Sequence, residues 1–221
     1  MDGLFEGTYT MGDLLAHGTL GIGTLGGLDG ELLIIEGVPY QINVAGEVRK
    51  VTEDEKTPYA AITDFVAEDS FVVRELLSAE QLKEYLKKNF ITKNTFQAVK
   101  IRGTFKEIIC RSVEKQEIPY PRLPEVAEQQ AEFTRKKVKG TMVGFYTPEI
   151  FGAIAVPEFH LHFLSEAEDF GGHVLTFSVE AGLAEWQNME TFEQHFPMQN
   201  KEFLEREIDY KNLAKDINKA E

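Results

Sequence analysis

Two histidines separated by one residue, His160 and His162, are followed after an acidic stretch by Gly171-Gly172-His173. Side chains two apart in a strand point to the same face, so an extended segment 159–164 projects both histidines together. The apolar runs on either side of the acidic stretch predict a β-hairpin with Leu164 opposite His173 and residues 165–172 as the loop. In this hairpin His173 shares the face of the other two histidines.

These three histidines favour a metal site over a merely polar strand face. Three neutral imidazoles suit zinc and other divalent first-row metals, and three protein ligands leave positions open for water or substrate, as in catalytic sites. A structural zinc site normally uses several thiolates, whereas Cys110 is the chain's one cysteine. The other two histidines, His17 and His195, are expected to lie outside the cluster.

Charge and hydropathy exclude several classes of protein. The net charge of −14 over 221 residues argues against nucleic-acid or anionic-membrane partners, which require basic patches. No apolar run reaches the length of a membrane span, and the first residues lack the basic and apolar blocks of a signal peptide. We therefore expect a cytoplasmic protein without nucleic-acid or membrane partners.

Apolar periodicity and capping residues predict two helices and a series of strands. One helix starts at Thr10 and stops at Gly18, and another covers 78–89 with Ser78 and Gln81 as a capping box. The strands are expected at 31–35, 40–44, 96–103, 105–113, 140–146, 154–164 and 173–179. The C-terminal tail, 201–221, has the spacing of one or two amphipathic helices.

The glycines at 21–30 form an expected loop rather than a dinucleotide-binding turn. Gly21-x-Gly23-x-x-Gly26 matches that fingerprint by letter, but it precedes a strand instead of following one and opening a helix.

The prolines of segment 118–124 predict a linker, because they suit neither a central strand nor the interior of a helix. We therefore expect an α+β, strand-dominated fold. Its N-terminal region, 1–118, carries a mixed β-sheet, and this region packs on a C-terminal region, 119–221, whose sheet or barrel carries the three histidines.

Segments spread over nearly the whole chain carry a family resemblance: His17-Gly18 with Gly21-Ile22-Gly23-Thr24, Leu28-Asp29-Gly30-Glu31, Lys56-Thr57-Pro58-Tyr59-Ala60, Arg111 with Gln116-Glu117-Ile118-Pro119-Tyr120, Gly140-Thr141 with Val143-Gly144-Phe145, and Phe159-His160-Leu161-His162-Phe163 with Gly171-Gly172-His173-Val174. They resemble the alpha-acetolactate decarboxylases of the butanediol pathway. The resemblance implies a homodimeric enzyme that converts 2-acetolactate to (R)-acetoin and carbon dioxide through a metal-bound enediolate.

The same resemblance implies the site residues. His160, His162 and His173 correspond to the family's zinc ligands. The catalytic residues are expected to be Arg111, Glu31, Glu221 and Thr24. No flavin, thiamine or pyridoxal signature is present, and zinc would serve as the electron sink.

From the residues alone, two other classes stay open. One is a different three-histidine metalloenzyme, either a zinc hydrolase or a non-haem iron oxygenase, in which Glu168 would supply a carboxylate ligand. The other is a non-enzymatic protein in which the metal only stabilises the hairpin.

Overall fold

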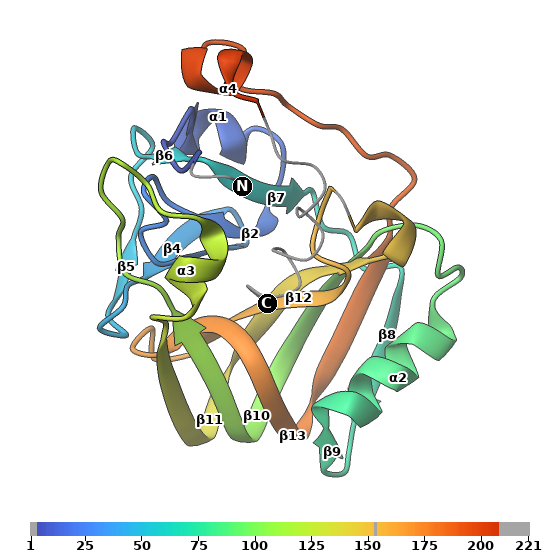
Figure 1. Ribbon diagram of the computed structural model, residues 1–221. Helices are drawn as coiled ribbons and strands as arrows, with labels where there is room; N and C mark the ends of the chain where they lie inside the picture. The colour runs from blue at the N-terminus through green and yellow to red at the C-terminus, as the bar shows by residue number, and fades with distance from the viewer. Residues whose placement is uncertain (1–3, 153, 208–221) are drawn as a thin grey trace.

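The computed structural model describes residues 4–152 and 154–207 of the chain (Figure 1). Its elements in chain order are β1 (Tyr9–Thr10), α1 (Met11–Leu15), β2 (Leu20–Thr24), β3 (Glu31–Ile35), β4 (Val38–Ile42), β5 (Val48–Lys50), β6 (Lys56–Thr57), β7 (Tyr59–Thr63), β8 (Asp69–Val73), β9 (Leu77–Ser78), α2 (Ala79–Asn89), β10 (Gln97–Ser112), α3 (Leu123–Ala127), β11 (Ala131–Thr147), the 3-10 turn η1 (Glu149–Phe151), β12 (Glu158–Ser165), β13 (Gly171–Asn188) and α4 (Lys201–Glu205).

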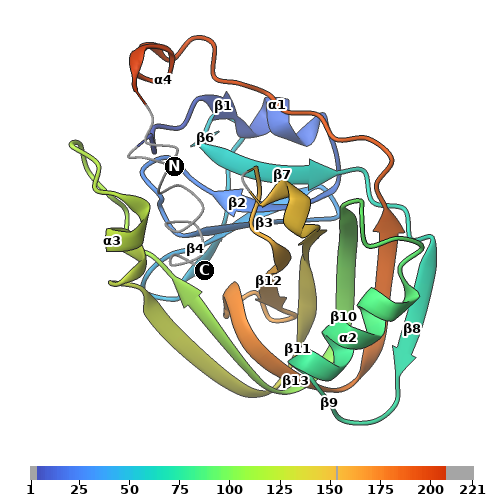
Figure 2. The same ribbon diagram turned by 45° about the vertical axis from the view of Figure 1, so that its right-hand side comes forward.

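Four long strands close on themselves in the larger of two main sheets. β10 pairs with both β11 and β13, β11 pairs with β12, and β12 pairs with β13. The strands β8 and β9 add to β13, and α2 lies against this sheet (Figure 2), with Leu82 and Leu86 packed in its apolar core. The closed arrangement holds an apolar core in which Phe105, Phe163 and Trp186 are almost fully buried.

The smaller main sheet has the strand order β5-β4-β3-β2-β7. Its pairings are all antiparallel, so the expected mixed sheet is an antiparallel one. Gly21 and Gly23 belong to strand β2, which lies between β3 and the edge strand β7, instead of to a loop, and this corrects the sequence interpretation. A Cβ at Gly23 would lie 2.4 Å from the backbone oxygen of Tyr59, so glycine permits the close pairing of β2 with β7.

The two sheets pack face to face through a shared apolar cluster. Leu33 and Ile42 from the N-terminal sheet contact a group that includes Val143 and Leu164 from the larger sheet. The buried Ser112 hydroxyl donates to the backbone oxygen of Ile42 across the same interface, at 2.9 Å. In the same interface β3 lies against β12, the strand that carries two of the three histidines.

The predicted N-caps of the first two helices are confirmed, whereas α1 ends at Leu15, before the predicted stop at Gly18. The Thr10 side chain accepts from the backbone of Asp13 at the start of α1, and Ser78 and Gln81 form a complete capping box on α2. The predicted proline linker contains the short helix α3, with Pro124 in its first turn, where proline is tolerated. In residues 4–152 and 154–207 no helix is long and apolar enough to cross a membrane.

The long strands differ from their predicted bounds. The segments predicted at 96–103 and 105–113 form the single strand β10. Gly103 pairs opposite Gly140 on β11 and opposite Gly182 on β13, and the missing side chains let the three backbones lie close together without interrupting the strand. β11 and β13 are longer than predicted, whereas β12 begins at Glu158, after η1. The strand predicted at 40–44 is shifted to Val38–Ile42.

The α+β, strand-dominated class is confirmed, with the three histidines in the C-terminal strands. The division into 1–118 and 119–221 stays a prediction, and the larger sheet draws strands from both sides of residue 118. Of the predicted tail helix, Lys201–Glu205 is helical, and residues 208–221 lie outside the described part of the chain.

Candidate metal centre

The β12–β13 hairpin brings the histidines together in a register two residues away from the predicted one. His162 pairs opposite His173, and Leu164 pairs opposite Gly171. Because strand side chains alternate with period two, this shift keeps the histidines on one face. Gly171 and Gly172 join β13 instead of the loop, and the backbone N–H of Ser165 closes the shorter turn by donating to Phe170 at 2.8 Å.

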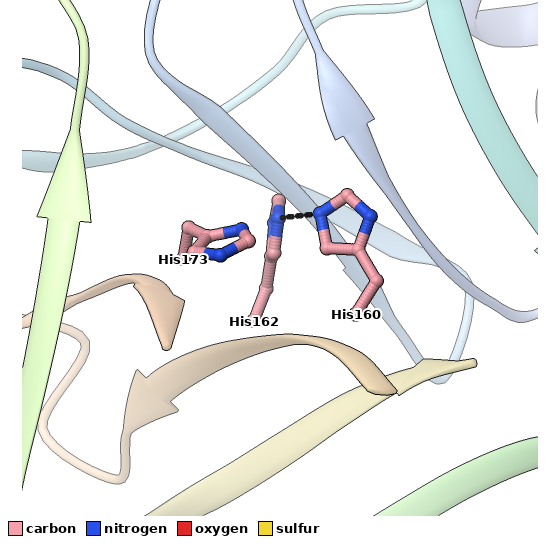
Figure 3. A group of neighbouring side chains, drawn as sticks. All are labelled: His160, His162 and His173. Atoms are coloured by element: carbon pink, nitrogen blue, oxygen red, sulfur yellow. Dashed lines mark hydrogen bonds between the residues drawn. The ribbon is translucent and has the colours of Figure 1, made fainter. Parts of the chain in front are cut away.

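The potential ligand atoms of His160, His162 and His173 all lie within 4.8 Å of one another. Figure 3 shows the rings side by side, with the Nε2 atoms of His160 and His162 facing each other at 3.2 Å. Two nitrogens on one tetrahedral zinc ion stand about 3.3 Å apart, given Zn–N lengths of ~2.0–2.1 Å. The spacing therefore fits a shared divalent metal.

A hydrogen bond fixes the ring of His162. Its Nδ1 lies 2.9 Å from the backbone oxygen of Leu32 in β3. A carbonyl oxygen accepts only, so Nδ1 carries the proton and Nε2 keeps its lone pair. This is the arrangement in which a second hydrogen bond orients a metal-binding imidazole, and it fits the histidines to a metal rather than to a polar strand face.

Burial keeps the three imidazoles neutral, as metal ligands must be. It lowers the pKa of His160 to about 3, with a further contribution from the positive charge of Arg111. Burial also holds the pKa of His162 and of His173 well below the usual histidine value, and the neighbouring His160 and Arg111 act in the same direction.

Glu31 and Arg111, two residues expected in the site, lie beside the histidines. Glu31 begins β3, and its Oε2 is 3.3 Å from Nε2 of His162. Arg111 lies near the end of β10, directly opposite His173 on β13, and is 6% exposed. Its Nη1 donates to Oε1 of Gln130 at 2.6 Å. The site thus joins a carboxylate and a guanidinium to three neutral imidazoles.

Thr24 lies in the adjacent strand β2, with its hydroxyl turned to its own loop. It donates to the backbone oxygen of Gly30 at 2.7 Å, which shapes the turn that leads into Glu31. Glu221 lies outside the described residues.

Three other side chains discussed in the sequence analysis lie apart from the three-histidine cluster. The Nε2 atom of His17 is 3.0 Å from the Tyr9 hydroxyl, and the ring centroid of His17 is 5.1 Å from that of His195. Tyr40 donates to Glu168 at 2.9 Å, and Glu168 is absent from the group of potential ligands among the described residues. The carboxylate ligand required by the iron-oxygenase alternative is therefore not supplied by Glu168.

Two residues that contribute to the site were not predicted from the sequence. They are Leu32, whose backbone oxygen orients His162, and Gln130, whose side chain holds Arg111. The position of Leu32 after Glu31 in a strand is a weak signal for the first. Nothing in the sequence pairs Gln130 with Arg111, because the turn between α3 and β11 creates that contact.

Comparison with known proteins identifies a family for this chain. A family model described as Alpha-acetolactate decarboxylase matches residues 1–210. The alpha-acetolactate decarboxylase of Lactococcus lactis subsp. lactis (strain IL1403) is 41% identical over 221 residues, covering 100% of this chain and 93% of the relative. That of Brevibacillus brevis is 41% identical over 197 residues, covering 89% of this chain and 69% of the relative.

Solved structures agree in fold over the same length. The alpha-acetolactate decarboxylase from Bacillus subtilis strain 168 has a TM-score of 0.96 at 30% identity, covering 100% of this chain and 94% of that one. A Staphylococcus aureus protein of unknown function, described as similar to alpha-acetolactate decarboxylase, has a TM-score of 0.96 at 44% identity, covering 99% of this chain and 94% of that one.

Proposed function

The chain belongs to the alpha-acetolactate decarboxylase family, and we propose that it forms (R)-acetoin and carbon dioxide from 2-acetolactate with zinc held by His160, His162 and His173. It is an enzyme, a decarboxylase of acetolactate. The observation that carries the zinc proposal is the convergence of three neutral imidazoles, one of them fixed by the Leu32 carbonyl.

The substrate determines what the site must provide. 2-Acetolactate has a ketone next to the carbon that bears its carboxylate and hydroxyl. When the bond to the carboxylate breaks, its electron pair moves onto that carbon and is delocalised to the ketone oxygen, and the carbon then takes up a proton to give acetoin. When bound, zinc supplies a Lewis acid that polarises oxygen ligands and lowers the cost of this developing charge.

Arg111 supplies a fixed positive charge for the carboxylate and for the developing anion. The buried guanidinium lies opposite His173, and its charge contributes to the lowered pKa of all three histidines, so its field reaches the whole cluster. Its forked N–H groups match a carboxylate. We assign to Arg111 the delivery of the proton to one face of the substrate carbon, directly or through water, which sets the (R) configuration.

Glu31 orients the substrate hydroxyl and takes up or returns its proton. Its carboxylate lies within hydrogen-bond range of the His162 nitrogen, so a ligand bound beside the histidines contacts it directly. We assign Glu221 to the same task from the C-terminal tail. Thr24 supports Glu31 by holding the preceding turn through Gly30.

We further propose that the enzyme acts as a homodimer in the cytoplasm, in acetoin and butanediol biosynthesis. The family resemblance supports the dimer and the pathway. A single buried cysteine, Cys110, is compatible with a reducing compartment.

The test is a joint measurement of product and metal. Purified protein is assayed with racemic 2-acetolactate, acetoin is resolved on a chiral column, and bound metal is quantified in the same preparation. The proposal expects (R)-acetoin and zinc in the wild type, and loss of both in His162→Ala. An exposed-histidine control, His195→Ala, is expected to keep both, and acetoin from a metal-free preparation would refute the role of zinc.

A further inference from the structure

We propose that Gln130 is a positioning residue of this decarboxylase: its amide orients Arg111 and keeps the carboxylate of Glu132 away from the guanidinium. This inference rests on the role proposed for Arg111. It assigns a task to a side chain that itself touches neither the histidines nor Glu31 among the interactions found in the described residues.

The register of the larger sheet creates the problem that Gln130 solves. Arg111 on β10 pairs directly opposite Glu132 on β11 and directly opposite His173 on β13. Cross-strand neighbours have Cβ atoms about 4.5–5.5 Å apart, within reach of an ion pair for long side chains. An ion pair with Glu132 would draw the guanidinium away from the histidines and neutralise the charge that the substrate carboxylate requires.

The amide of Gln130 engages both charged groups at once. Its oxygen accepts from Nη1 of Arg111 at 2.6 Å, and its nitrogen lies 3.4 Å from Oε1 of Glu132. This orientation of the amide follows from its neighbours, since a guanidinium only donates and a carboxylate only accepts. Because this acceptor is neutral, the Gln130 bond orients Arg111 without adding a negative charge beside the guanidinium.

The position of Gln130 is fixed by the short helix before it. Val126 of α3 is 4% exposed and packs in a small core with Phe5 and Leu28. The backbone N–H groups of Gln129 and Gln130 then close the turn that leads into β11 by donating to Val126 and Ala127. The Gln130 side chain is therefore delivered by a buried anchor, whereas the neighbouring Gln129 is exposed.

The test compares Gln130→Met with Gln129→Met. The two variants make the same chemical change at adjacent positions, but only the first removes the amide oxygen that accepts from Nη1 of Arg111. A hydrogen bond to a charged group corresponds to roughly a tenfold to hundredfold effect. We expect kcat/KM for acetoin formation to fall at least about tenfold in Gln130→Met, mainly through KM, and to stay within about twofold in Gln129→Met.

A second substitution separates positioning from simple structural support. In Gln130→Met the carboxylate of Glu132 is free to approach Arg111, so Gln130→Met/Glu132→Gln is expected to recover at least about threefold in kcat/KM. Metal content and the thermal unfolding midpoint should match in both single methionine variants. If Gln130→Met does not fold, Gln130→Ala takes its place in the series.

The proposal is overturned if Gln130→Met stays within about twofold of the wild type, or if Glu132→Gln brings no recovery. A wild-type protein without acetoin formation would instead refute the proposed function itself, so the two failures are distinguishable.

Discussion

Replacement of Glu31 by glutamine removes one negative charge from the site and leaves the shape of the side chain almost unchanged. The carboxylate is 12% exposed, and its Oε2 lies 3.3 Å from Nε2 of His162. A group in this position acts on any proton of a substrate oxygen bound beside the histidines. General acid–base catalysis contributes about 10²–10⁴-fold, or roughly 2.7–5.4 kcal/mol of transition-state stabilisation.

We therefore expect Glu31→Gln to lower kcat at least about 100-fold while the protein stays folded. The assay is acetoin formation at saturating 2-acetolactate, with bound zinc quantified in the same sample and far-UV circular dichroism as the fold control. Glu36→Gln is the matched control. Glu36 directly follows the last residue of β3, and its exposed carboxylate lies 3.6 Å from the Arg102 guanidinium. The Glu36→Gln variant should keep the wild-type activity.

The result against this reasoning would be a Glu31→Gln protein that binds zinc and keeps kcat within about threefold of the wild type. Loss of zinc together with activity would also contradict it, because Glu31 would then act on the metal site and not on the substrate proton.

Other predictions follow from the same contacts. Arg111→Met should lower kcat/KM at least about 100-fold, whereas Arg102→Met, at an exposed position of the same strand, should leave it unchanged. Burial keeps the pKa of the three histidines below the usual value, so below about pH 6.5 the unfolded state binds more protons than the folded state. As the pH is lowered below about 6.5, the free energy of unfolding of the chelated protein should therefore decrease, by up to ~1.4 kcal/mol per pH unit for each histidine. A free energy of unfolding that does not change over this pH range would contradict the prediction. Tyr40→Phe removes the bond to Glu168 that ties the N-terminal sheet to the hairpin loop; it should cost about 1 kcal/mol, lower the melting temperature by roughly 2–4 °C and spare kcat.

Local sequence signals predicted the starts of α1 and α2 and the histidine face well, whereas the short helix α3 in the proline-rich segment was not predicted. The caps at Thr10 and Ser78 depend on neighbours a few residues away, so the sequence contains all the information they need. The convergence of the histidines survived an error in register, because a shift of two residues does not change the face of a strand.

Features set by distant contacts were predicted less well. Gly103 was interpreted as a strand end, but it lies in the middle of β10, where its meaning depends on two glycines far along the chain. Gly21 and Gly23 were assigned to a loop for the same reason, since only the approach of β7 explains them. The contact of Gln130 with Arg111 has no local signal, because it arises from the turn after α3.

The most direct test of the central claim is acetoin formation by the purified protein before chelation, after chelation, and after addition of zinc. The account predicts that activity on 2-acetolactate is lost with the metal, that the chelated protein stays folded at neutral pH, and that zinc restores the rate. Full activity in the chelated, metal-free protein would contradict the account, as would the absence of acetoin from folded protein loaded with zinc.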